Sequence, residues 1–125
     1  MILDKLLAGD LSTATAVLND ELKNGSNHVQ LINMFENQLR LDMHIKLAQD
    51  EGRNITDVGK ILGITNSYRT NAIARQIRSI PATALEERFR ACVDVDFDTK
   101  SGKIDGKAAL NALMFKLVMP KKRNF

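Results

Sequence analysis

Several features common in other protein classes are scarce in this chain of 125 residues. It has no tryptophan, only 5% aromatic residues and a single cysteine, Cys92. One cysteine excludes a disulfide within the chain and agrees with a reducing, cytoplasmic setting. No apolar run approaches the ~18 to 20 residues of a membrane span, and the first residues lack the basic-then-apolar layout of a secretory signal. These absences exclude a disulfide-stapled or membrane-spanning fold.

The residue sets that run most enzymatic reactions are missing as well. No Gly-rich phosphate loop and no Ser/His/Asp set is visible. His28 and His44 lie 16 residues apart in one expected helix, with no acidic or cysteine neighbour at ligand spacing. Cys92 falls in an apolar stripe and is expected to be a core residue rather than a nucleophile. We therefore predict that the chain is not an enzyme and holds no metal ion or cofactor.

The longest uninterrupted segment of the expected fold runs from His28 to Glu51. It contains 24 residues without Gly or Pro, which permits one long helix. One side carries Ile32, Phe35, Leu39, Met43 and Leu47, and the opposite side carries Met34, Leu41, Ile45 and Ala48. A helix with two apolar sides needs neighbours on both flanks. The sequence therefore predicts an all-α fold, a compact bundle of about six helices around a long central helix.

Capping residues and Gly or Pro breaks divide the remainder into further helices. The expected helices occupy residues 1–8, 10–23, 54–62, 66–78, 82–100 and 105–117. For the helix of residues 82–100 we expect an inner edge made of Leu85, Phe89, Cys92 and Val93. No segment has the pattern of a strand, and 44% hydrophobic residues suffice for one aliphatic core.

A run of carboxylates near residue 100 superficially resembles a calcium loop. Asp94, Asp96 and Asp98 match the first three acidic positions, but Thr99 replaces the required Gly and Asp105 replaces the final Glu. The helical pattern also continues through this segment, so its carboxylates would point in different directions. We favour a structural interpretation, in which Asp96 faces inward and needs a basic partner or the N–H groups that open the next helix.

Charge is distributed unevenly and permits an alternative function. Residues 1–66 hold six basic and nine acidic residues, whereas residues 67–125 hold twelve basic and six acidic ones. Residues 55–77 have the order of a helix-turn-helix, so a DNA-binding domain using Asn66 to Arg78 is the alternative hypothesis. Its candidate DNA contacts are Arg69, Arg75 and Arg78. The simpler interpretation is a solvated surface with a basic tail at residues 120–125.

Taken together, these signals resemble the C-terminal domain of the delta subunit of bacterial DNA polymerase III, a clamp-loader protein. The similarity covers residues 5–118 and is carried by Leu7 to Asp10, Gln38 to Arg40, Ile55 to Ile64, and Asp96 with the Lys100-Ser101-Gly102 turn. The chain departs from the family pattern at Gly59, where a helix former is usual. Asp42 and His44 also interrupt a stretch that is more often aliphatic.

The resemblance implies a non-catalytic assembly domain that joins a helical collar in the clamp loader during DNA replication. It divides the chain into the end of a preceding helix (1–9), a collar domain (10–119) and a basic tail (120–125). Implied partners are the other clamp-loader subunits, the sliding clamp through absent N-terminal domains of AAA+ type, and DNA in the whole complex. We expect part of one long helix's outer face to contact another subunit, and the candidates are either Met34, Leu41 and Ile45 or Val95 and Phe97.

Overall fold

The computed structural model describes residues 2–120, which form an all-α body as predicted. Its helices are α1 (Ile2–Leu7), α2 (Leu11–Lys23), α3 (His28–Asp50), α4 (Ile55–Ile61), α5 (Ser67–Ile77), α6 (Ala82–Lys100) and α7 (Gly106–Leu117). No strand occurs between residues 2 and 120. Within the same range, no helix combines the length and apolar character needed to cross a membrane. Of the predicted basic tail, residues 121–125 lie outside the described residues.

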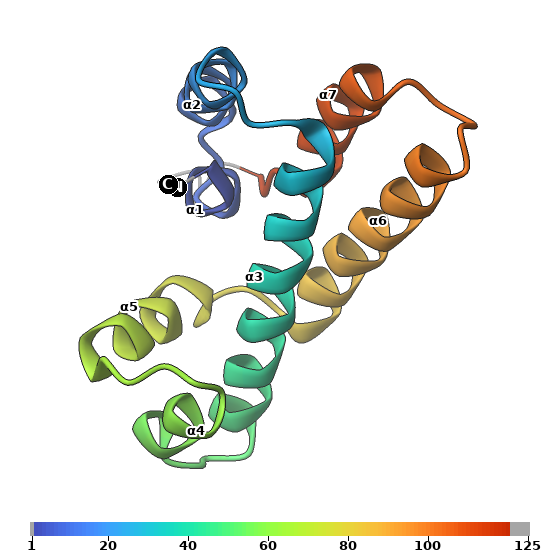
Figure 1. The fold of residues 1–125 in the computed structure, drawn as a ribbon. Helices are drawn as coiled ribbons and strands as arrows, with labels where there is room; N and C mark the ends of the chain where they lie inside the picture. Colours follow the sequence, from blue (N-terminus) through green and yellow to red (C-terminus); the bar gives the residue numbers. More distant parts are fainter. Residues whose placement is uncertain (1, 121–125) are drawn as a thin grey trace.

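The long helix α3 runs through the middle of the molecule, with α6 and α7 on one side and α1, α2, α4 and α5 on the other (Figure 1). A reciprocal capping box opens it, because Gln30 N donates to Asn27 Oδ1 at 2.9 Å and Asn27 N donates to Gln30 Oε1 at 3.1 Å. Gly52 follows the helix at a φ of +69°, a conformation that favours glycine. The prediction of one uninterrupted central rod is confirmed.

The buried side of α3 differs in part from the predicted stripes. It consists of Leu31, Ile32, Phe35, Leu39, Asp42, Ile45, Lys46 and Ala48. Leu47 was expected in the core but is 53% exposed. Phe35 and Leu39 face the centre of the bundle, and Leu47 lies further round the helix, at the outer edge of its contact with α6. The prediction that Leu47 is a core residue is therefore wrong.

Helix α6, which packs against both α3 and α7, also buries a different residue from the one predicted. The contact with α7 includes Arg88, whose guanidinium donates to Leu117 O at 2.8 Å and to Val118 O at 3.1 Å. Because α7 covers this side of α6, Val95 is turned inward. Val93 was predicted to lie inward, but it is 42% exposed.

Helix α1 is a full part of the body, although residues 1–9 were expected to be the end of a preceding helix. Ile2, Leu3, Leu6 and Leu7 are all buried in the shared core. Met119 N donates to Leu6 O at 2.9 Å, and Gln76 Nε2 donates to Asp4 O at 2.9 Å. These bonds connect α1 to α5 and to the segment after α7, so residues 2–7 fold together with the segment from residue 10 onward.

The contact between α4 and α5 explains the unusual glycine at position 59. A Cβ placed on Gly59 would lie 2.5 Å from Thr70 Oγ1 and 2.7 Å from Thr70 Cγ2. Both Gly59 and Thr70 are buried. The short helix α4 therefore packs directly on α5 because residue 59 has no side chain.

Candidate interaction surfaces

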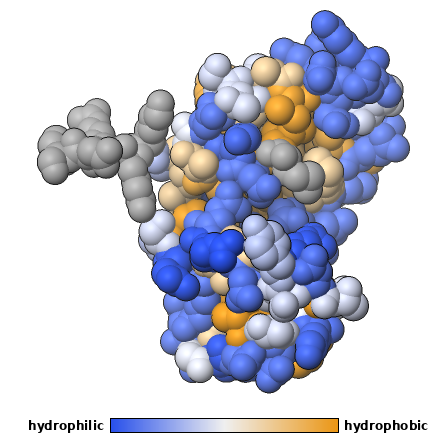
Figure 2. All heavy atoms as spheres, turned by 90° about the vertical axis from the view of Figure 1, so that its left-hand side faces the viewer, coloured by the Kyte–Doolittle hydropathy of each residue, from blue (hydrophilic) through white to orange (hydrophobic). Residues whose placement is uncertain are grey.

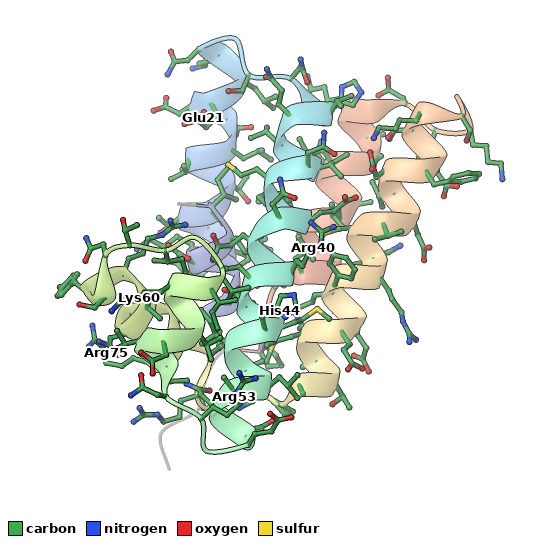
Figure 3. The ribbon with its side chains drawn as sticks, turned by 60° about the horizontal axis from the view of Figure 1, so that its bottom comes forward. Glu21, Arg40, His44, Arg53, Lys60 and Arg75 are labelled. Atoms are coloured by element: carbon green, nitrogen blue, oxygen red, sulfur yellow. The ribbon has the colours of Figure 1, made fainter. Side chains whose placement is uncertain are left out.

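Three exposed apolar side chains lie on the paired helices α3 and α6, and we call Leu47, Val93 and Phe97 the α3–α6 seam. Their side chains are 53%, 42% and 63% exposed. Between the two helices lies a cavity of about 230 Å³, lined by Arg40, Met43, His44, Leu47, Ala82 and Glu86 among others. Figure 3 shows Arg40 and His44 along α3, beside α6. This cavity therefore lies at the Leu47 end of the seam, and Val93 and Phe97 lie further along α6.

Cationic and aromatic side chains meet at two places near the seam. The Arg40 guanidinium carbon lies 5.4 Å from the centroid of the half-buried Phe89 ring. Lys103 Nζ lies 5.7 Å from the centroid of the exposed Phe97 ring. Both distances fall within the range of cation–π contacts. Aromatic residues and arginine are also enriched at protein–protein interfaces.

The predicted subunit contacts fall into three environments. Phe97 is exposed, and Met34 and Leu41 are half-buried. Ile45 is fully buried and Val95 is buried against the neighbouring helices. Ile45 and Val95 therefore offer no surface in this fold, and their selection as contacts is corrected. The exposure of Leu47 and Val93 was not predicted, because both residues continue apolar stripes that resemble core edges.

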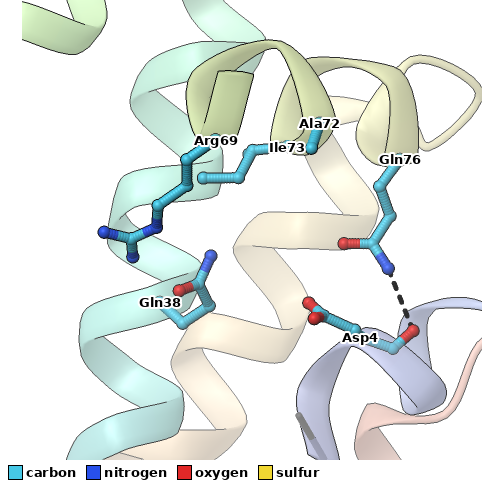
Figure 4. Close-up of a pocket in the computed structure, with 6 residues that line it drawn as sticks. All are labelled: Asp4, Gln38, Arg69, Ala72, Ile73 and Gln76. Carbon is cyan, nitrogen blue, oxygen red and sulfur yellow. Dashed lines mark hydrogen bonds between the residues drawn. The ribbon is translucent and has the colours of Figure 1, made fainter. Parts of the chain in front are cut away.

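Met34 and Leu41 line a second, more polar groove. It has a volume of about 580 Å³ and is lined by Gln30, Asn33, Met34, Asn37, Gln38, Leu41 and Arg69. An adjoining cavity of about 360 Å³ shares Gln38 and Arg69, whose side chains face one another (Figure 4). The molecular face formed by α1, α2, α4 and α5 is mostly hydrophilic (Figure 2). Amide groups dominate this groove.

The three arginines predicted to contact DNA do not share one surface. Arg69 borders the amide-rich groove, whereas Arg75 and Arg78 line a separate cleft between α3 and α5. Two further residues of the proposed reading helix are already engaged. Thr70 is buried at the contact with α4, and Asn66 caps α5 by accepting a hydrogen bond from Tyr68 N at 2.9 Å. Thr70 and Asn66 are therefore not free to contact bases, whereas Ser67, Arg69 and Asn71 of the same helix remain exposed.

The carboxylates near residue 100 adopt the structural roles that we favoured. Asp94, Asp96 and Asp98 all lie within α6, which continues to Lys100. Lys100 Nζ lies 3.0 Å from Asp96 Oδ1, which supplies the predicted basic partner. Asp105 caps α7 by accepting from Ala108 N at 3.1 Å. Between residues 2 and 120, no three His, Cys, Asp or Glu side chains are grouped as metal ligands.

Several titratable groups are buried between helices. Asp42 is 1% exposed; Gln38 Nε2 donates to its Oδ1 at 2.9 Å, and its Oδ2 has no hydrogen-bond partner. Burial raises the pKa of Asp42 to about 7, and the Asp4 carboxylate contributes in the same direction against the Gln38 bond. Burial also raises the pKa of Glu36, and neighbouring Asp96 adds to this rise. These groups lie at helix contacts.

Cys92 belongs to the same buried region. Burial, with smaller contributions from Glu36 and Asp96, raises the pKa of its thiol to about 12. The thiol is therefore protonated at neutral pH and does not act as a nucleophile. This agrees with the prediction that Cys92 is a core residue.

Comparison with known proteins identifies the family of this helical domain. The family model for the DNA polymerase III delta subunit, C-terminal domain, matches residues 1–117. The chain belongs to this family. Its fold is similar to the Bacillus subtilis DNA clamp loader delta protein (YqeN), with a TM-score of 0.84 and 19% identity over 93% of this chain and 34% of that one. The chain thus spans about a third of that protein's length. No curated protein sequence matches it.

Family membership confirms the resemblance found in the sequence. The DNA polymerase III delta C-terminal domain is a structural part of the clamp loader rather than a catalytic one. The helix-turn-helix alternative has no support from these matches or from the positions of Thr70 and Asn66.

Proposed function

We propose that this delta C-terminal domain joins the clamp-loader collar by packing its α3–α6 seam against another subunit. The observation that carries the proposal is the exposure of three large apolar side chains, Leu47, Val93 and Phe97, beside one helix pair. Exposed apolar surface of this kind marks protein–protein contact sites. Arg40 on α3 and Phe89 on α6 contact one another across the same helix pair, and both are residue types enriched at protein–protein interfaces.

The amide-rich groove with Met34 and Leu41 is our second candidate surface. Its apolar side chains are only half-buried, so a partner segment would gain apolar contact there. Its many amide groups must also be hydrogen-bonded when covered, since unpaired buried polar groups cost free energy. The seam carries no comparable run of amides, which makes it our first choice.

We also propose the setting in which the domain works. The chain corresponds to about a third of its structural relative, so the remaining parts of a whole delta subunit would make the other contacts. We assign contact with the sliding clamp, and its opening and loading, to N-terminal domains outside this chain. The cytoplasm is the proposed location, in agreement with the unpaired Cys92.

Co-elution with the other clamp-loader subunits tests the proposed surface. Phe97→Ser removes a seam side chain, and Phe115→Ser is its matched control, because Phe115 is 70% exposed on α7. Leu47→Ser is paired in the same way with Ile61→Ser on α4, where Ile61 is 77% exposed. We expect each seam variant to weaken assembly at least tenfold and each control to assemble like the unaltered chain. Equal behaviour of seam and control variants would refute the choice of surface.

A further inference from the structure

The C-terminal end of α5 is fixed to α3 by buried polar contacts. Lys46 Nζ donates to Arg78 O at 3.0 Å and to Ile77 O at 3.5 Å. Gln49 Nε2 donates to Ala74 O at 2.6 Å. These bonds satisfy carbonyl groups that a helix end leaves free, and the Lys46 charge complements the helix dipole. The α5 backbone that carries Arg75 and Arg78 is therefore held rigidly against α3.

Beside this junction lies a cleft of about 670 Å³ between the end of α3, the start of α4 and one side of α5. Its charged lining consists of Lys46, Asp50, Arg53, Arg75 and Arg78. Four cations thus face one carboxylate. Arg53, Lys60 and Arg75 lie toward the α4–α5 end of the molecule, and Glu21 lies toward the opposite end (Figure 3).

Most of this positive charge is not neutralised within the chain. The salt bridges among residues 2–120 do not include Arg75 or Arg78. Arg53 lies 4.0 Å from Glu51, but both side chains are about half exposed, where such pairs are weak. Lys46 Nζ lies 3.8 Å from Asp50 Oδ1 and donates its hydrogen bonds to backbone carbonyls at the end of α5. Three guanidinium groups from two segments are therefore available to an external anion.

We infer that this cleft binds the phosphodiester backbone of DNA without reading base sequence. Guanidinium groups form paired hydrogen bonds with phosphate oxygens, and Asn71 in the cleft adds an amide donor. Ile55 and Ala74 are the only apolar residues besides Gly52 in the described lining, so the cleft offers no cluster of large apolar side chains to anchor a peptide. The choice of DNA among polyanions rests on the proposed function in a DNA-replication complex. Arg69 is outside this site because it borders the other groove.

Fluorescence anisotropy with the full chain tests the cleft. The probes are a labelled mixed-sequence duplex and one of its single strands. The triple variant Arg53→Gln, Arg75→Gln, Arg78→Gln is compared with a control of equal charge change, Lys23→Gln, Lys107→Gln, Lys116→Gln, whose lysines are exposed elsewhere. Three phosphate contacts contribute about −2.7 to the slope of the logarithm of duplex affinity against the logarithm of salt concentration. When salt is raised from about 50 to 200 mM, the affinity of the unaltered chain should therefore fall about 40-fold more than the affinity of the cleft variant. The control should follow the unaltered chain.

Three results would overturn the inference. The two triple variants could lose the same affinity, which would mean that only net charge matters. An oligoglutamate could compete better than the duplex, which would identify an acidic polypeptide site. The cleft variant could bind DNA normally and fail to co-elute with clamp-loader subunits, which would make the cleft a subunit contact. Failure of the proposed function would appear differently, as unchanged assembly of Phe97→Ser and Leu47→Ser.

Discussion

Replacing Asp42 by Asn should stabilise the domain above neutral pH. Asp42 lies in the core, where its carboxyl has one hydrogen bond, from Gln38, and one oxygen without a partner. Burial raises the pKa of this group from 3.8 to about 7, which means that folding opposes its ionisation. The protonated form is compatible with the core, whereas the ionised form favours the unfolded chain. Asn has nearly the same shape, carries no charge and retains an oxygen for Gln38.

The magnitude follows from the shift in pKa. Each pH unit between the unfolded and folded pKa values corresponds to about 1.4 kcal/mol, so ionisation at pH 8 costs the fold roughly 4 kcal/mol. The stabilising contribution of the protonated group is complete below pH ~3.8 and is lost as pH rises through about 7. The unaltered protein should therefore lose about 2 to 3 kcal/mol between pH 5 and 8. An unpaired Asn amide costs about 1 to 2 kcal/mol, which leaves a net gain of about 2 to 3 kcal/mol at pH 8.

Urea unfolding followed by circular dichroism from pH 5 to pH 8 measures these differences. Asp42→Asn should be more stable than the unaltered chain at pH 8 and should show the smaller dependence on pH. Some dependence should remain, because the raised pKa of Glu36 acts in the same direction. Asp20→Asn is the control, since Asp20 is an exposed residue of α2. An Asp42→Asn variant that is destabilised equally at every pH would refute the reasoning.

Other predictions concern the packing of the same helices. Gly59→Ala should destabilise the fold by about 1 to 3 kcal/mol because the new methyl group meets Thr70. Without that contact, alanine would stabilise the helix by about 1 kcal/mol. A rise in melting temperature would therefore contradict the predicted clash. Adding Thr70→Ala should recover most of the loss. Lys46→Met should cost about 2 kcal/mol in urea unfolding, because two carbonyls at the end of α5 lose a charged donor. Cys92 should react with a thiol reagent only after denaturation, since it is buried and its pKa is raised to about 12; rapid labelling of the native protein at pH 8 would contradict this.

The positions of the helices could be predicted because local chemistry determines their ends. Five helices begin after a side chain that accepts a hydrogen bond from a backbone N–H group of the first turn: Asp10, Asn27, Asn54, Asn66 and Asp105. Each bond lies within one turn of chain, so sequence spacing is sufficient to find it. The absence of Gly and Pro from α3 was equally informative about its length.

The rotation of each helix against its neighbours could not be predicted in the same way. Leu47 and Ile45 are two residues apart on α3, and Val93 and Val95 are two apart on α6. In both pairs, the exposed residue was predicted to lie in the core and the buried residue was predicted to lie on the surface. Two apolar stripes on one helix leave open which of them a partner covers. That choice depends on distant segments, in particular on α7 packing against the Val95 side of α6.

For the candidate sites as well, local features could be predicted from the sequence and the packing of distant segments could not. Phe97 was correctly placed off the main stripe of its helix, and it is exposed. The separation of Arg69 from Arg75 and Arg78 was not visible, because it depends on how α5 lies across α3. That Arg53 lines the same cleft as Arg75 and Arg78 was not predicted, because it lies in the turn after α3, distant in sequence from the arginines of α5.

The central claim is that this delta C-terminal domain functions by joining other subunits. Light scattering during size-exclusion chromatography, on a mixture of the chain with the remaining clamp-loader subunits, tests it most directly. We predict that the chain enters the larger complex and that Phe97→Ser, but not Phe115→Ser, remains outside it. A chain that elutes at its own monomer mass, with the subunits present in excess, would contradict the claim.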